Sequence, residues 1–378
     1  MKKIISLMLL AVAVLGLIVV NKPQKAYADN DYCVGKAMAV YEGNSGSLLY
    51  EKNAYDHLAI ASTTKIITCI VAIENYPNLD NEVLVSDKAV GIEGTSIYLK
   101  HGEKIRFKDL LYGLMLASGN DCAVAIAEEV AGVDRFVAMM NEYAAKCGAT
   151  NTHFTNPHGL DQKDHYSCAY DMAKITAKAL DNPVFKEIVS TKYKTINETN
   201  VYQKRYLKHK NRILFNDENC IGVKTGFTDN AGRCLVSASE KDGMRVVSVV
   251  LNCQPMFEEC ARLDKLVYDN YCYKTFVVPY TYVGATYVEK GEKEDVGLAT
   301  IEGYSALIKR GDEDKYRVEY DIPKTILAPV ELNQKTGKVT VYKGDEIVYE
   351  NNLYTIDSIK NVDFRYMMDN IISKWFVG

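Results

Sequence analysis

The stretch IGVKTGFTDNAGRCLVSASEKDGMRVVSVVL, residues 221–251, decides the fold of this 378-residue chain. It contains three apolar, β-branched runs, at 221–227, 234–239 and 245–251, separated by two short breaks that contain aspartate and glycine. Runs of this length between such breaks are typical of antiparallel strands joined as a meander. We therefore predict three consecutive antiparallel strands, followed by a helix from about residue 257 to 271.

The segments that precede this meander predict a hairpin and a group of helices. Two short apolar runs, 37–41 and 47–50, flank a glycine-rich turn. The segment 62–74 is apolar on nearly every side, which predicts a helix buried in the middle of the domain. Between about 105 and 190, apolar residues recur every three or four positions, as in a helical lobe. If the hairpin pairs with the meander, the two ends form one five-stranded antiparallel sheet beside this lobe, an α/β (α+β) fold.

The remainder of the chain after the meander has a different pattern. Short runs rich in Val, Thr and Tyr over 277–360 predict a separate small β domain. In 361–378, bulky apolar residues fall on one face of a helix, at Phe364, Met367, Met368, Ile371, Ile372, Trp375 and Phe376. Such a helix can pack on the β domain, but Trp and Phe also anchor well in a membrane interface. We predict an amphipathic helix that associates with a membrane surface.

The N-terminus has the order of an export signal. Two lysines precede an uncharged run over 4–20, and a polar segment follows that ends in Ala26-Tyr27-Ala28. We predict cleavage before Asp29, with an uncleaved anchor as the alternative, because the run is slightly long for a signal core. In either case the rest of the chain works outside the cytoplasm. The predicted parts are the signal (1–28), a main domain (29–276), a β-rich domain (277–360) and a terminal helix (361–378).

Charge and cysteine content narrow the possible partners and the environment of the chain. The formal net charge is −4, and it becomes −8 when the four lysines of residues 1–28 are removed. Nucleic acid is therefore not an expected partner, since phosphate binding requires a basic surface.

The ten cysteines are scattered without a CxxC pair, and several lie among apolar residues. We predict mostly free, buried thiols rather than a disulfide framework.

Ser62 and Lys65 form a Ser-x-x-Lys motif at the beginning of the predicted buried helix. Three residues apart on a helix, the hydroxyl and the amine share a face, so the amine can take the hydroxyl proton. The simpler alternative is a capping serine and a solvated lysine. A lysine one turn into an apolar helix is partly desolvated, however, which lowers its pKa towards that of a useful base.

Two further motifs contain residues with catalytic or binding chemistry. Ser118-Gly119-Asn120 separates two predicted helices; it can serve as a cap, or it can pass a proton and hold a substrate amide. Lys224-Thr225-Gly226 lies inside the first strand of the meander, where the glycine admits another backbone and Lys and Thr can bind a carboxylate. A second copy, Lys335-Thr336-Gly337, falls in the β-rich tail, and we interpret it as a simple turn.

The three motifs occur in this order with intervals of 56 and 106 residues, a set found in penicillin-binding proteins and class A β-lactamases. The chain resembles the low-molecular-mass penicillin-binding proteins, which are serine D-alanyl-D-alanine carboxypeptidases. The likeness extends to Asn156-Pro157-His158-Gly159-Leu160-Asp161, His165-Tyr166-Ser167 and residues 224–229, and to the order of the four parts. It implies a serine β-lactamase/transpeptidase-like fold for the main domain.

The resemblance also implies an activity and a role for each motif residue. The expected substrate is a peptidoglycan stem peptide ending in D-Ala-D-Ala, and β-lactams are expected inhibitors. Ser62 is expected to form an acyl-enzyme with Lys65 as its base, while Ser118 relays the proton to the departing D-alanine and Asn120 positions the chain. The implied substrate-binding residues are Lys224, Thr225, Gly226 and Phe227. The terminal carboxylate is expected to rest on Lys224 and Thr225, and the oxyanion on the backbone N–H groups of Ser62 and Phe227. No cofactor or metal is expected, and the enzyme is expected to be attached peripherally to the outer face of the cytoplasmic membrane.

Recognition of the substrate carboxylate is only partly assigned. Relatives often carry an arginine after the meander, but the corresponding stretch here reads MFEEC at 256–260, and Arg262 is the nearest candidate.

Three alternative functions remain. A class A β-lactamase needs a Glu-x-x-x-Asn stretch between the second and third motifs, and none occurs between Asn120 and Lys224. A penicillin-sensing or wall-binding protein would keep the pocket without hydrolysis. A zinc hydrolase would lack the usual HExxH and would use His153, His158, Asp161, Asp164 and His165.

Overall fold

The computed structural model describes residues 27–28, 33–364, 366–368 and 371–372. The contacts between residues divide the chain into two compact units, which meet in the sequence between Asn270 and Tyr271. The sequence places this boundary slightly later, after Phe276. The predicted export signal lies outside the described residues except for its last two positions.

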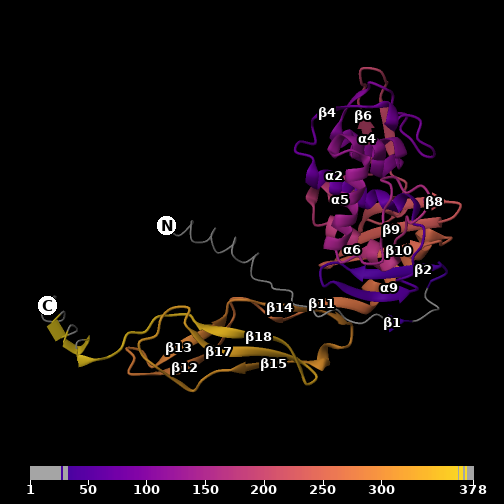
Figure 1. Ribbon diagram of the computed structural model, residues 1–378. Helices are drawn as coiled ribbons and strands as arrows, with labels where there is room; N and C mark the ends of the chain where they lie inside the picture. Colours follow the sequence, from indigo (N-terminus) through magenta and orange to yellow (C-terminus); the bar gives the residue numbers. More distant parts are fainter. Residues whose placement is uncertain (1–26, 29–32, 365, 369–370, 373–378) are drawn as a thin grey trace. The chain divides into compact units, whose positions relative to one another are not determined.

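A six-stranded sheet in the order β1-β3-β2-β10-β9-β8 forms the centre of the first unit (Figure 1). Five of these strands are antiparallel neighbours, and β2 pairs with β10, so the hairpin joins the meander as predicted. The sixth, β1, is a two-residue strand parallel to β3. The bounds are β1 (Tyr27–Ala28), β2 (Ala37–Glu42), β3 (Ser47–Lys52), β8 (Cys220–Thr228), β9 (Gly232–Lys241) and β10 (Met244–Leu251).

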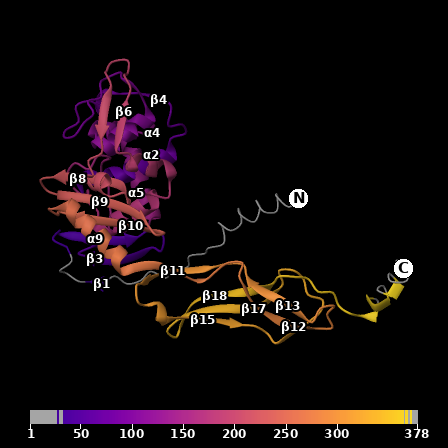
Figure 2. The same ribbon diagram turned by 180° about the vertical axis from the view of Figure 1, so that it is seen from behind.

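Side chains of the sheet alternate between two covered faces. In β10, Val247 and Val249 belong to the large core that the sheet shares with the helices, whereas Ser248 between them donates to Asp264 of α9 (Met256–Asn270). Because successive strand residues point to opposite faces, α9 and the helical lobe cover opposite sides of the sheet. Figure 2 shows α9 beside β9 and β10.

The helical lobe surrounds α2, which is buried along its first eight residues. The predicted helix over 62–74 begins instead with a 3₁₀ turn, because the hydroxyls of Thr63 and Thr64 bind the carbonyls three residues back and favour the tighter winding. The helical segments are η1 (Ala61–Thr64), α2 (Lys65–Asn75), η2 (Asp87–Ala89), α3 (Phe107–Tyr112), η3 (Gly113–Ala117), α4 (Asn120–Val130), α5 (Val133–Lys146), α6 (Ala169–Ala179), α7 (Pro183–Ser190) and α8 (Ile213–Asn216). Two small antiparallel sheets pair β4 (Glu82–Leu84) with β5 (Lys104–Arg106) and β6 (Tyr193–Ile196) with β7 (Arg205–Lys208).

The second unit is built from strands, as the sequence predicts. A two-stranded sheet pairs β11 (Tyr271–Val277) with β14 (Tyr304–Lys309), and a six-stranded sheet has the order β15-β17-β18-β13-β12-β16. The strands of the larger sheet are β12 (Tyr282–Glu289), β13 (Asp295–Thr300), β15 (Tyr316–Asp321), β16 (Thr325–Leu327), β17 (Lys335–Lys343) and β18 (Glu346–Thr355), with η4 (Glu313–Lys315) before β15. The second Lys-Thr-Gly copy begins β17, so the predicted turn is wrong. A Cβ on Gly337 would lie 2.6 Å from the Asp321 carbonyl, so this glycine allows two strands to approach.

The described part of the terminal segment is helical at residues 364, 366–368 and 371–372. Its apolar side chains are all exposed, namely Phe364, Met367, Met368, Ile371 and Ile372. Trp375 and Phe376 lie outside the described residues. Among the helices that are described, none has the length and apolar character needed to cross a membrane.

All ten cysteines fall within the described residues and carry free thiols. Eight are buried, and Cys147 and Cys272 are half-buried.

Candidate active site

A cavity of about 470 Å³ opens in the first unit beside η1, the beginning of α4 and the end of β8. Six of the eight predicted site residues line it: Ser62, Ser118, Asn120, Thr225, Gly226 and Phe227. The two remaining residues, Lys65 and Lys224, are fully buried and hydrogen-bonded to residues of the cavity wall. The fold therefore brings together three motifs that are separated by 56 and 106 residues in the sequence.

Lys65 has three partners within hydrogen-bond distance of its Nζ. They are Ser62 Oγ at 2.9 Å, Asn120 Oδ1 at 2.6 Å and the carbonyl oxygen of His158 at 2.7 Å. Complete burial, together with the nearby positive charge of Lys210, lowers the pKa of Lys65 to about 7. Close to neutral pH, the amine can therefore exist in either protonation state.

Lys224 lies on β8 and connects the strand to the second motif. Its Nζ donates to Ser118 Oγ at 3.0 Å and to the carbonyl of Thr225 at 2.8 Å. Burial lowers the pKa of Lys224 well below its usual value, and the charges of Lys65 and Lys210 act in the same direction. Ser118 itself has a positive φ of 66° between η3 and α4, which brings its hydroxyl to the cavity wall.

The His158 carbonyl is a partner of Lys65 that the sequence motifs do not reveal. It belongs to the loop 156–161, where Asn156 Oδ1 accepts from the Gly159 N–H at 2.7 Å and Thr68 Oγ1 donates to the Pro157 carbonyl at 2.7 Å. A Cβ on Gly159, whose φ is +85°, would lie 2.0 Å from the Ala61 carbonyl oxygen. The Asn-Pro-His-Gly stretch thus forms a tight loop that turns a backbone acceptor towards Lys65.

Gly226 lets β8 lie directly against η1. A Cβ at this position would be 3.0 Å from the Ile60 carbonyl oxygen and 3.1 Å from the Ser62 nitrogen. Because neither neighbour is the end of a flexible side chain, a larger residue must move one backbone segment away from the other. The glycine therefore sets the distance between β8 and the backbone N–H of Ser62.

A loop over 93–99 forms the wall beside the second motif. Thr95 accepts through its carbonyl from the Asn120 N–H at 2.7 Å and donates through its hydroxyl to the Ser118 carbonyl at 2.5 Å. The amide nitrogen of the Asn120 side chain donates to the Glu93 carbonyl. Asp121 accepts from the backbone N–H groups of Ile97 and Leu99. These bonds fix the loop on the beginning of α4.

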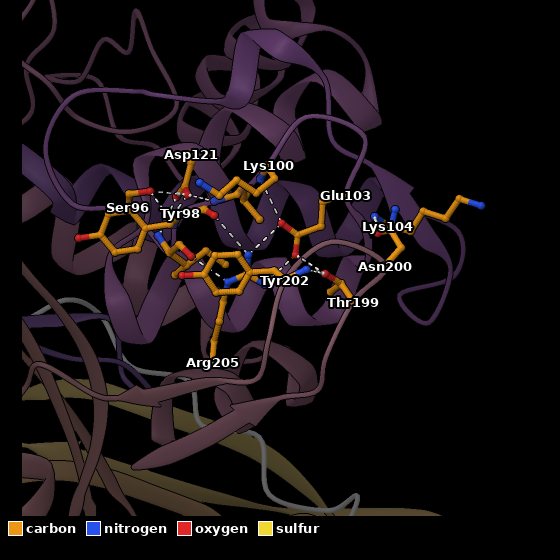
Figure 3. A network of polar contacts seen from close by, with 12 residues as sticks. Ser96, Tyr98, Lys100, Glu103, Lys104, Asp121, Thr199, Asn200, Tyr202 and Arg205 are labelled. Carbon is orange, nitrogen blue, oxygen red and sulfur yellow. Dashed lines mark hydrogen bonds and ion pairs between the residues drawn. The ribbon is translucent and has the colours of Figure 1, made fainter.

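A buried ion pair holds the same loop from the other side (Figure 3). Arg205 of β7 is 2.6 Å from Glu103 Oε1 through Nη1 and 2.8 Å from Oε2 through Nη2, with both side chains almost fully buried. Its Nε also donates to the Ile97 carbonyl at 2.8 Å, and its guanidinium stacks on the ring of Tyr202. Thr199 Oγ1 adds a hydrogen bond to the Glu103 carboxylate. Arg205 thereby connects β7 to the loop that contacts Ser118 and Asn120.

Comparison with known proteins gives the family of this chain. Residues 24–255 match the family model described as D-alanyl-D-alanine carboxypeptidase, and residues 272–361 match that of the penicillin-binding protein 5 C-terminal domain. The chain belongs to the D-alanyl-D-alanine carboxypeptidase family. The predicted family, fold class and serine-type hydrolase activity are thereby confirmed.

Individual relatives span both units of this carboxypeptidase. The D-alanyl-D-alanine carboxypeptidase DacF of Bacillus subtilis (strain 168) is 29% identical over 97% of this chain and 98% of its own length. DacC of Escherichia coli (strain K12) is 31% identical over 87% of this chain and 85% of its own. The crystal structure of penicillin-binding protein 5 from Haemophilus influenzae covers 90% of this chain and all of its own, with 27% identity and a TM-score of 0.67.

The positive charges around the cavity of the carboxypeptidase differ from those the sequence suggests. Arg262 does not line the cavity; its guanidinium forms an ion pair with Glu259 at 2.7 Å. The cations that do line it are Lys210, Arg212 and Arg233, none of which is predicted from the sequence. Lys210 and Arg212 come from the segment between β7 and α8, and no motif marks that segment in the sequence.

The histidines considered for a zinc site serve the loop beside Lys65. His165 Nδ1 accepts from the Thr155 N–H at 3.0 Å and its Nε2 lies 2.9 Å from Thr64 Oγ1, while His158 Nδ1 accepts from the Leu160 N–H at 3.1 Å. Burial lowers the pKa of both His158 and His165 to about 4, so both are neutral at pH 7. Within the part of the chain that the structure describes, no three His, Cys, Asp or Glu side chains converge as metal ligands.

Proposed function

We propose that this carboxypeptidase releases the terminal D-alanine of a peptidoglycan stem peptide through an acyl-enzyme on Ser62. The proposal is carried by the three partners of Lys65. Two of them, Asn120 Oδ1 and the His158 carbonyl, can only accept hydrogen bonds. A neutral amine has two N–H donors and one lone pair, so it satisfies both acceptors and directs the lone pair to Ser62 Oγ. Lys65 is then the base that takes the Ser62 proton.

The attack of the Ser62 oxygen on the penultimate carbonyl develops negative charge on the carbonyl oxygen. We assign the stabilisation of that charge to the backbone N–H groups of Ser62 and Phe227. This assignment is supported by the close approach of β8 to η1 at Gly226, which brings the two segments together beside Ser62.

The departing D-alanine must receive a proton when its C–N bond breaks. We assign this transfer to Ser118, whose hydroxyl accepts from Lys224 and can therefore turn its own proton towards the cavity. The proton that Lys65 took from Ser62 replaces the one that Ser118 gives up, so Lys65 is neutral again in the acyl-enzyme. Lys65 then takes a proton from the water molecule that attacks the acyl-enzyme and passes it to the departing Ser62 oxygen. β-Lactams are expected to acylate the same oxygen and to leave slowly.

The terminal carboxylate of the substrate is assigned to Thr225, close to the charges of Lys224 and Lys210. Lys210 lowers the pKa values of both Lys65 and Lys224, so it acts at short range on the inner part of the cavity. A bound carboxylate would be attracted by the positive charge of Lys210, which lines the cavity. This would favour binding of a peptide with a free C-terminus.

The test replaces Ser62 by alanine in the full chain. We expect the Ser62→Ala variant to release no D-alanine from a D-Ala-D-Ala peptide and to form no covalent adduct with fluorescent penicillin. Ser358→Ala, an exposed serine of the second unit, is the matched control and should retain both activities. Mass mapping should locate the wild-type adduct on Ser62. Persistent labelling of the alanine variant would overturn the assignment, and labelling of the wild type without D-alanine release would favour a penicillin sensor.

We also propose that the enzyme acts outside the cytoplasm, exported by residues 1–28 and held on the membrane surface by residues 361–378, where it trims peptidoglycan and limits cross-linking. Support comes from the exposed apolar side chains of the terminal helix, including Phe364 and Ile371. Deletion of 361–378 should release the protein from membranes into the soluble fraction. If the shortened protein stays bound, the N-terminal segment is the anchor instead.

A further inference from the structure

The cavity contains more positive charge than the carboxylate of D-Ala-D-Ala requires. Lys210, Arg212 and Arg233 all line it, and no Asp or Glu occurs among the described residues of its wall. In the described part of the chain, no carboxylate forms an ion pair with any of the three cations. Unpaired cations around one cavity indicate an anionic ligand. With Lys210 assigned to the terminal carboxylate, Arg212 and Arg233 have no assigned partner.

Each of these two arginines makes a cation–π contact with an aromatic ring of the same cavity. The Arg212 guanidinium carbon lies 5.4 Å from the centre of the Phe257 ring, and that of Arg233 lies 5.6 Å from the centre of the Phe227 ring. A cation–π contact draws a guanidinium towards the ring without neutralising its charge and leaves its N–H groups available. Both arginines therefore keep their charge beside the cavity and can bind a carboxylate.

The position of Arg233 relates it to the path of the substrate. β8 is the last strand of its sheet, and residues 225–228 on it line the cavity. An extended peptide can pair with such a free strand edge. Arg233 is the direct cross-strand partner of Phe227, which lies within this stretch. When a peptide pairs along β8 with its scissile bond at Ser62, another part of the peptide therefore lies near Arg233.

We propose that Arg212 and Arg233 form a subsite for a second carboxylate of the stem peptide, on a residue that precedes D-Ala-D-Ala. The proposal rests on the function proposed above and defines its substrate class as peptides with at least two carboxylates. The second carboxylate can come from the side chain of the residue before D-Ala-D-Ala or from a residue further towards the N-terminus. The whole chain is negative, with a formal charge of −4, so a preference for anionic peptides requires local cations.

The test compares five peptides that differ only in the acyl groups on lysine. Diacetyl-L-Lys-D-Ala-D-Ala is the reference with a single carboxylate. Two isomers carry one succinyl group, on Nε or on Nα, with acetyl on the other amine, and each has a neutral counterpart with succinamoyl in place of succinyl. We expect kcat/KM for one or both succinyl peptides to exceed that of its neutral counterpart by about 3- to 10-fold at low salt. The advantage should disappear at high salt because the arginines are exposed.

For each isomer, the measured quantity is the ratio of kcat/KM for the succinyl peptide to kcat/KM for its succinamoyl counterpart. The isomer for which this ratio is larger identifies the source of the second carboxylate. In the double variant Arg212→Gln, Arg233→Gln, the succinyl-to-succinamoyl ratio should fall to near one. Arg135→Gln removes an exposed cation of α5 that does not line the cavity, and it should keep the wild-type ratio. Wild-type ratios near one for both isomers, or a ratio that persists in the double variant, would overturn the subsite.

Release of D-alanine from the diacetyl reference keeps the two proposals distinguishable. If the wild type hydrolyses that peptide but shows no preference for a succinyl group, the subsite is wrong and the carboxypeptidase mechanism stands. If it hydrolyses none of the peptides and no penicillin adduct forms, the mechanism fails and the subsite fails with it.

Discussion

Asn120 accepts a hydrogen bond from Lys65 through Oδ1 at 2.6 Å and donates through the nitrogen of the same amide to the Glu93 carbonyl. The two partners fix the orientation of the amide, because only its oxygen can face the lysine. The side chain beside Lys65 is therefore an acceptor without charge. This arrangement keeps Asn120 from stabilising the ammonium form of Lys65 as a carboxylate would.

We predict that Asn120→Asp slows acylation of Ser62 at pH 7. A carboxylate within hydrogen-bond distance favours the protonated amine and should raise the pKa of Lys65 by about 1 to 3 units. Since the base must be neutral, the acylation rate at pH 7 should fall by about 10- to 1000-fold. The measurement is the rate of labelling by fluorescent penicillin from pH 5 to 10.

The wild-type profile is the reference for this comparison. With a Lys65 pKa of about 7, labelling should lose about tenfold per pH unit below pH 7, and the acidic limb of the variant should lie at higher pH. Asn182→Asp is a matched control, since Asn182 caps α7 through its side-chain oxygen and aspartate caps equally well. Superimposable profiles for Asn120→Asp and the wild type would rule out Lys65 as the base.

The sequence predicts the parts of the site that depend on short spacing or on a recognisable set of motifs. Ser62 and Lys65 are three residues apart, so one turn of 3₁₀ or α-helix brings their side chains together in either case. The motif order predicts that Ser118 and Lys224 join them. The five antiparallel strands follow from the runs and turns of 221–251 and the hairpin before them.

What the sequence misses depends on backbone atoms or on segments without a pattern of their own. The His158 carbonyl contacts Lys65, but any residue has a carbonyl, so no residue type marks it. Arg212 and Arg233 reach the cavity only after a loop and a strand end are folded against each other. Arg262, which its sequence position favours, forms an ion pair with Glu259 of the preceding helical turn.

Gly226→Ala should slow acylation while leaving the fold intact. The added Cβ would meet the Ser62 nitrogen at 3.1 Å and the Ile60 carbonyl oxygen at 3.0 Å, so β8 must move away from η1 by a few tenths of an ångström. Because oxyanion stabilisation depends on donor distance, we expect labelling by penicillin to fall by about 10- to 100-fold.

Gly243→Ala is a control in a turn where a Cβ meets no atom within 4 Å. It has a positive φ, so it should affect stability rather than labelling. Normal labelling of Gly226→Ala would show that β8 does not contribute to the oxyanion site.

Arg205→Ala should lower both stability and the acylation rate. The substitution leaves Glu103 buried without its partner, which typically costs about 3 to 5 kcal/mol. It also removes the donor to the Ile97 carbonyl, which loosens the loop that holds Ser118 and Asn120. Urea unfolding measures the first effect and penicillin labelling at a temperature where the variant is folded measures the second.

Two further variants serve as controls for Arg205. Arg135→Ala breaks an exposed ion pair with Glu142 and should cost less than about 1 kcal/mol. Arg205→Lys keeps the charge but loses the forked geometry, so it should recover stability better than it recovers labelling. Full labelling by a folded Arg205→Ala protein would show that the ion pair supports the fold alone.

Asp264 should make the folded protein less stable as the pH rises from about 4 to 7. Its carboxyl group is buried under the sheet, accepts from Ser248, and has a second oxygen without a hydrogen-bond partner in the described part of the chain. Burial raises its pKa to about 7. The folded state therefore holds a proton that the unfolded state releases near pH 4, so stability falls between these two values, by on the order of 2 to 4 kcal/mol. Asp264→Asn cannot ionise, so the urea midpoint of the wild type should fall relative to that of Asp264→Asn as the pH rises from 5 to 8, whereas Asp269→Asn, on the exposed side of α9, should follow the wild type. Parallel wild-type and Asp264→Asn curves over this range would mean that Asp264 is not protonated in the folded protein.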